Sequence, residues 1–121
     1  MPLKANFIKM PTLIYDNEPF EIVRKGVKRK KIYTDKLITV LLDFTNGPWD
    51  KPEPFHSHPH KQTSYIATGE IIFFCEGEKE QNLKAGDMFA VPSGLKHTIQ
   101  LLSKKARLID SFYPARKDFL I

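Results

Sequence analysis

The stretch GDMFAVPSGLKH, residues 86–97, places a short apolar run between turn-forming residues. Gly86 and Gly94 mark the ends of extended segments, and Pro92 fixes a bend before His97. This arrangement fixes the direction of one side chain, that of His97, at the end of a strand. A lone histidine is more often a surface residue or a core residue with its hydrogen bonds satisfied. His97 therefore indicates a binding site only if other ligand residues lie beside it.

The other three histidines of the chain lie in HSHPHKQ, residues 56–62. An extended strand presents His56 and His58 to one face, because they are two residues apart. In a straight strand Gln62 would lie roughly 20 Å from His56. One ion could not touch both, since ligand bonds are only about 2.0–2.2 Å long. We therefore predict a turn near Pro59 and His60 that brings Gln62 onto the neighbouring strand.

Strand signals dominate the remaining sequence, and helical periodicity is scarce. Apolar residues alternate over Leu37 to Phe44. The apolar run Ile71 to Phe74 ends at a turn over 76–78, and Leu83 to Val91 passes through a turn over 85–87. Short strands with regular turns predict an all-β barrel or sandwich.

Two further strands are expected at His97 to Leu102 and Ala106 to Tyr113, joined by the polar turn 103–105. We predict that they pair as a hairpin, and the alternative is a helix over Leu101 to Ile109.

The composition predicts a single packed domain. The chain has 121 residues, of which 41% are hydrophobic and 27% charged, which is ordinary for a folded domain. We assign residues 1–23 to an N-terminal arm or edge strand and 24–121 to the barrel. Its tail, Pro114 to Ile121, could pack across the barrel mouth.

The sequence indicates a cytoplasmic protein that is not embedded in a membrane. Cys75 is the only cysteine, so it cannot form an intramolecular disulfide. Met1 to Tyr15 lack the apolar core of a signal peptide, and no run approaches the roughly 18 apolar residues of a spanning helix.

The net charge is +5, and much of it lies in one basic run. No aromatic residues are interleaved to stack bases, so we interpret the run as a solvated hairpin and expect no nucleic-acid partner. Excess positive charge would still help to attract a small anionic substrate. The run consists of Arg24, Lys25, Lys28, Arg29, Lys30 and Lys31.

The two histidine segments together resemble the paired motifs of the cupins. The resemblance implies a double-stranded β-helix, or jelly roll, holding one divalent metal ion through His56, His58, Gln62 and His97. Two features depart from the usual pattern. The glycine before the first histidine is displaced to Gly47, and the usual glutamate ligand is Gln62. His60 stays open as a further ligand, or else as a mouth-lining or exposed residue.

Near the C-terminus, Asp110 shares a strand face with Leu108 and Phe112. If that face lines the barrel, Asp110 is a candidate general acid or base, and the alternatives are a supporting or solvent-facing carboxylate. Arg116 could hold a substrate carboxylate bidentately, or be an ordinary surface arginine.

The chain is further similar to the small cupins of the KdgF family. The similarity is carried by the stretch at 56–62, GVKRK at 26–30 and the ending DSFYPARKDFL at 110–120. It implies conversion of cyclic 4,5-unsaturated uronates to the linear keto sugar in pectin and alginate breakdown. Asp110 and Arg116 would be catalytic, and Phe112 and Arg116 would bind substrate. It also makes the basic run an ordinary strand.

We therefore expect a metal-dependent enzyme acting on a small anionic sugar, and a homodimer as in similar cupins. Zn, Ni, Mn, Fe or Co would suit the ligand set. A neutral amide ligand leaves the ion a stronger Lewis acid, and the missing carboxylate disfavours oxygen chemistry. Two alternatives remain: another cupin enzyme (an oxygenase, isomerase or lyase on a small acid), and a non-enzymatic sugar-binding cupin.

Overall fold

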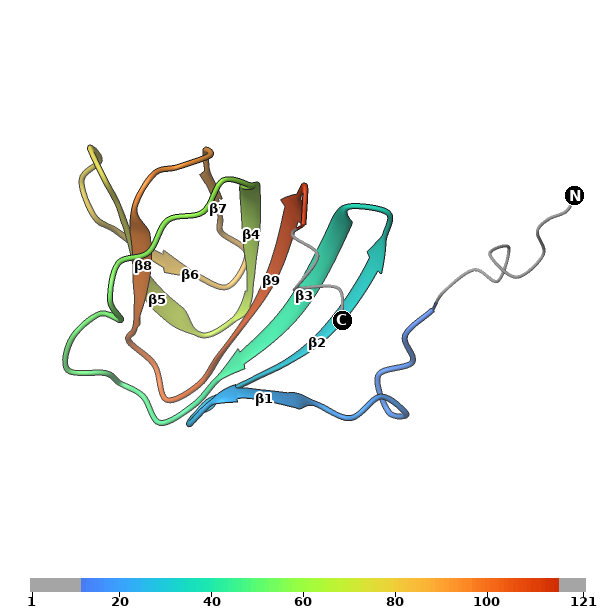
Figure 1. Ribbon diagram of the computed structural model, residues 1–121. Helices are drawn as coiled ribbons and strands as arrows, with labels where there is room; N and C mark the ends of the chain where they lie inside the picture. Colours follow the sequence, from blue (N-terminus) through green and yellow to red (C-terminus); the bar gives the residue numbers. More distant parts are fainter. Residues whose placement is uncertain (1–11, 116–121) are drawn as a thin grey trace, which may run out of the picture.

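The computed structural model describes residues 12–115. Within this range the chain forms strands and turns but no helix, as the sequence predicts (Figure 1). The strands are β1 (Glu21–Arg24), β2 (Val27–Thr34), β3 (Leu37–Phe44), β4 (Lys61–Thr68), β5 (Glu70–Cys75), β6 (Gln81–Lys84), β7 (Met88–Val91), β8 (His97–Leu101) and β9 (Ala106–Tyr113).

The strands form two antiparallel sheets. The larger sheet has the order β1-β2-β3-β9-β4-β7, and the smaller has the order β6-β5-β8. Figure 1 shows the two sheets as opposite walls of a barrel, with β8 and β5 facing β3 and β9. The predicted all-β jelly-roll barrel is confirmed.

The alternation of side chains along β3 and β9 builds the interior. In β9 every second residue from Ala106 to Phe112 is buried, and in register these residues lie beside the inward residues of β3, from Ile38 to Phe44. An apolar cluster packs between the two sheets. Burying each Leu, Ile, Val or Phe there contributes about 1.5–3 kcal/mol. The cluster comprises Val27, Phe44, Ile66, Ile71, Leu101, Ala106 and Leu108.

The predicted hairpin of the last two strands is wrong. β8 pairs with β5, with Leu101 opposite Ile71, whereas β9 inserts between β3 and β4 in the other sheet. The turn at 103–105 is therefore a crossing between sheets. Both strands are buried on their inner faces, and each pairs with strands of a different sheet.

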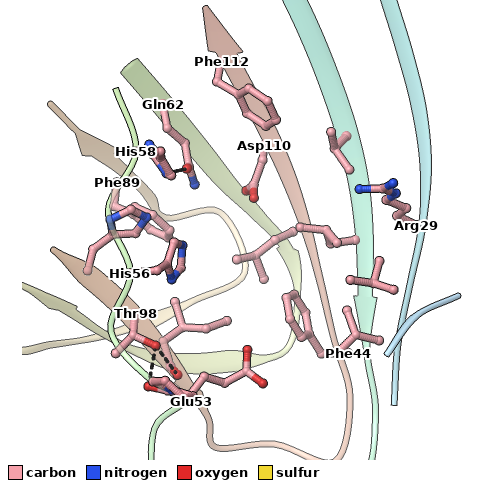
Figure 2. Close-up of a pocket in the computed structure, with 18 of the residues that line it drawn as sticks. Arg29, Phe44, Glu53, His56, His58, Gln62, Phe89, Thr98, Asp110 and Phe112 are labelled. Carbon is pink, nitrogen blue, oxygen red and sulfur yellow. Dashed lines mark hydrogen bonds between the residues drawn. The ribbon is translucent and has the colours of Figure 1, made fainter. Parts of the chain in front are cut away.

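The basic run forms the β1–β2 hairpin, but it is not simply a solvated face. The Lys30 side chain is buried on the outer face beneath Tyr15 and Phe20, with its ammonium 3.8 Å from the centre of the Tyr15 ring. Arg29 points to the opposite side, into the barrel (Figure 2). Successive residues of a strand face opposite sides, so one run of charge serves two surfaces.

The predicted domain boundary after residue 23 falls inside β1, the edge strand of the larger sheet. Most of the predicted C-terminal tail lies outside the described residues, whose last member, Ala115, donates its backbone N–H to the Lys36 carbonyl at 2.7 Å. In residues 12–115 there is no helix long and apolar enough to cross a membrane.

Candidate metal centre

Backbone pairing brings the two histidine segments together. His56 and His97 form an isolated antiparallel bridge in which each N–H donates to the carbonyl of the other, at 3.1 and 2.9 Å. Gly94 also donates its N–H to the His58 carbonyl at 2.9 Å. Segments some 40 residues apart in sequence thus share one wall, and their imidazoles converge.

The ligand atoms of His56, His58 and His97 all lie within 4.8 Å of one another. The ring centres of His56 and His97 are 4.3 Å apart, and those of His58 and His97 are 4.7 Å apart. Three imidazoles this close could bind one metal ion.

The environment lowers the pKa of two of these imidazoles. Burial lowers the pKa of His97 to about 4. Burial first, and then the nearby His58, lower the pKa of His56. Metal binding requires unprotonated imidazole nitrogens, and low pKa values remove the competing protons at neutral pH.

Two observations indicate that a cation fits this group. The Nδ1 of His97 donates to the Leu95 carbonyl at 3.0 Å, which leaves Nε2 as a lone pair, and that buried Nε2 has no hydrogen-bond partner among the described residues. If the Nδ1 of His58 donates to the His60 carbonyl at 3.2 Å, its Nε2 also offers a lone pair. It faces the Gln62 Oε1 at 3.1 Å, and an ion could satisfy both acceptors.

Gln62 reaches the site by the predicted turn. The chain bends at Pro59 and His60, and β4 begins at Lys61. The Nε2 of Gln62 donates to the Ser64 Oγ at 2.9 Å, which directs its carbonyl oxygen toward His58. The amide oxygen thus stands at the edge of the histidine group.

His60 is not in this group of three, and its interpretation as an exposed residue is wrong. It is only 2% exposed. Its ring stacks on Phe112 on one side and on His58 on the other, with ring centres 4.4 and 3.7 Å apart. It lines the same cavity as the three histidines and supports the ring of one of them.

A cavity of about 570 Å³ opens in front of the histidines, between the two sheets. This is a common size for a small-molecule site. Phe89 and Ile99 contribute apolar wall, and Asp110 and Phe112 project into the cavity from β9 (Figure 2). The predicted inward face of β9 is confirmed.

Asp110 is buried in this cavity. Burial raises its pKa to about 6, although a hydrogen bond with Ser64 opposes the shift. Ser64 also accepts from Gln62, so a short polar chain joins the histidine group to Asp110. A carboxyl group that titrates near neutral pH can both give and take a proton. Arg116 lies outside the described residues.

The cavity also contains charged residues that were not predicted. Glu53 accepts a bidentate pair of hydrogen bonds from Arg24 and, through its backbone carbonyl, one from Thr98. Arg29 stands on the opposite wall. The sequence contained one indication of this position. Arg29 lies two residues after the apolar Val27, so both side chains point to the inner face of β2.

Comparison with known proteins identifies relatives of this arrangement. The model of the family described as "Cupin domain" matches residues 47–112. The chain is 38% identical to the pectin degradation protein KdgF of Dickeya dadantii (strain 3937), over 88% of this chain and 96% of the relative.

Two solved structures are also similar to this chain, in both sequence and fold. KdgF from a Halomonas species superposes with a TM-score of 0.78 at 30% identity, covering 88% of this chain and 96% of that one. An RmlC-like cupin from Shewanella frigidimarina NCIMB 400 also superposes with a TM-score of 0.78, at 31% identity, covering 88% of this chain and 93% of that one.

Proposed function

The chain belongs to the cupin family and, within it, to the KdgF family, and we propose that it opens cyclic 4,5-unsaturated uronates to the linear keto sugar. The observation that carries the proposal is the shared cavity, in which the histidine group and the buried carboxyl group of Asp110 face one space.

His56, His58 and His97 would hold one divalent metal ion, with the amide oxygen of Gln62 as a fourth ligand. All four donors are neutral, so the ion would keep its full charge and supply Lewis-acid polarisation of a bound sugar oxygen. Zn, Ni, Mn, Fe and Co all accept such a set, and availability decides between them.

Asp110 would move the proton that the reaction requires. Ring opening breaks the C1–O5 bond as the O1 hydroxyl loses its proton and C1 becomes an aldehyde. The electron pair left on O5 gives an enolate at C5, which becomes the ketone when C4 gains a proton. One carboxyl group near its pKa can accept the first proton and return it at C4, so the isomerisation balances without a co-reactant.

Phe112 and Arg116 would complete the substrate site. The Phe112 ring, held against His60, offers an apolar face to the sugar ring. Arg116 follows the end of β9 by three residues and would supply one of the guanidinium groups that pair with the substrate carboxylate.

The proposal is tested by following the ultraviolet absorbance of a 4,5-unsaturated galacturonate. Metal-loaded protein should speed its loss above the spontaneous rate, and chelation should return the rate to the spontaneous one. Reloading the metal should restore turnover. A metal-loaded protein that leaves the spontaneous rate unchanged contradicts the proposed function.

A further inference from the structure

Two guanidinium groups of the described residues line the cavity, and they differ in how they are paired. Arg24 is held by both carboxylate oxygens of Glu53, which itself lines the cavity. The charge of this pair is therefore cancelled within the cavity wall. Arg29 has its ion-pair partner, Glu21, outside the cavity lining.

Arg29 is built into the wall. It lies on β2 opposite Leu42 of β3, on the same sheet face as Val27. Its side chain is 26% exposed, and its Nε donates to the Glu21 Oε1 at 3.1 Å. Glu21 is its cross-strand neighbour on β1. This contact fixes the guanidinium from one edge.

The terminal nitrogens of Arg29 remain available for a ligand. Among the described residues only its Nε has an assigned hydrogen bond, and a guanidinium carries five N–H donors. Lys31, also on this face, has its Nζ 3.8 Å from the same Glu21 oxygen. Two cations thus approach one carboxylate.

We infer that Arg29 binds the carboxylate of the substrate, on the wall that faces the histidine group. Figure 2 shows the histidines on one side of the cavity, Arg29 on the other and Asp110 between them. A uronate bound with its carboxylate at Arg29 would direct the rest of its ring toward Asp110 and the histidines. The inference rests on the proposed function for the identity of the substrate.

Arginine suits this role because its planar fork matches a carboxylate in two hydrogen bonds, and the cavity limits screening by water. Loss of charge-assisted hydrogen bonds of this kind lowers affinity about ten- to a hundredfold. The affinity should decrease for ligands that carry a carboxylate and should be unchanged for neutral sugars of the same shape.

The test compares binding of galacturonate and galactose to metal-loaded protein by calorimetry, for the wild type, Arg29→Met and Arg29→Lys. Methionine keeps much of the side-chain length without the charge, and lysine keeps the charge without the fork. Lys28→Met is the matched control, since it removes a positive charge from the outer face of the same strand, where Lys28 lies over Phe20.

We expect Arg29→Met to weaken galacturonate binding about ten- to a hundredfold with galactose unchanged, Arg29→Lys to fall between, and Lys28→Met to match the wild type. In turnover, Arg29→Met should raise KM more than it lowers kcat. If Arg29→Met binds galacturonate as the wild type does, the inference is overturned.

The proposed function can fail separately. A wild type that prefers galacturonate through Arg29 but does not turn over the unsaturated sugar supports the carboxylate site and contradicts the reaction. Turnover that Arg29→Met leaves unchanged supports the reaction and contradicts the carboxylate site. A wild type with neither turnover nor preference contradicts both.

Discussion

Asp110 is a residue whose acid–base chemistry the fold changes strongly. In the unfolded chain its carboxyl group titrates near 3.8, and burial raises the pKa in the folded protein to about 6. Between these values the folded state binds more protons than the unfolded state. Stability from this group is therefore full below pH 3.8 and is lost as the pH rises through 6.

Asp110→Asn should remove this pH dependence. In metal-free protein we expect the variant to be more stable than the wild type at pH 8, by up to about 3 kcal/mol, because asparagine carries no buried charge. At pH 4 the two should be close. Urea denaturation at both pH values measures the difference.

Asp50→Asn is the control, since Asp50 is exposed and lies outside the cavity lining. It should leave the pH dependence of stability unchanged. A difference between Asp110→Asn and the wild type that is the same at pH 4 and pH 8 would contradict the buried, titrating carboxyl group.

The roles of His97 and His60 can be separated by metal content. His97→Ala removes one of three converging imidazoles and should weaken metal binding by more than the roughly 10–100-fold that an outer-shell change costs. His60→Ala removes a ring that stacks on His58 and should retain the metal. Elemental analysis of the purified variants measures both, and loss of metal from His60→Ala to the same extent would mean that His60 is a ligand.

At the scale of the elements, the crossing between the sheets depends on Gly69, between β4 and β5. Its φ is +89°, and a Cβ there would lie 2.6 Å from the Cβ of Ala106 and would also meet the Lys105 carbonyl. The two chain segments that change sheets pass each other here without room for a side chain.

Gly69→Ala should therefore destabilise the protein by about 3 kcal/mol or more, the sum of backbone strain and overpacking. Gly77→Ala is the matched control, because Gly77 has a φ of +83° with open space around it. It should cost about 1–2 kcal/mol from backbone strain alone. Equal midpoints of thermal unfolding for the two variants would contradict the close-approach argument.

Periodicity predicted the strands better than their partners. The alternation in β3 and β9 is a local property, so Leu37–Phe44 and Ala106–Tyr113 could be read directly. The pairing of β8 with β5 depends on contacts between residues 22 to 30 positions apart in the sequence, which no local pattern records. Short polar connections such as 103–105 suit a hairpin and a sheet crossing equally well.

At the scale of the whole molecule, the group of histidines that could bind a metal ion was the most predictable feature. His56, His58 and His97 follow from spacing, and Gln62 from a required turn and the family resemblance. The burial of Lys30, on the outer face of the basic run, could not be predicted from spacing. It depends on tertiary packing, in which Tyr15 and Phe20 cover the Lys30 side chain.

The homodimer stays a prediction, and the β1 edge offers a surface for it. Ile22 is 76% exposed and Val23 is 40% exposed on an edge strand with one partner in the described chain. We expect light scattering to give twice the chain mass of 14.0 kDa. Ile22→Lys should shift the protein toward the monomer, and a monomeric wild type would contradict the prediction.

We propose that the histidine group and Asp110 serve one reaction in one cavity. The most direct test is the rate at which metal-loaded wild type and Asp110→Asn consume a 4,5-unsaturated galacturonate. We predict that the wild type exceeds the spontaneous rate and that Asp110→Asn, with its metal retained, loses about 10²–10⁴-fold of the catalysed rate. A wild type at the spontaneous rate, or an Asp110→Asn variant as fast as the wild type, would contradict the claim.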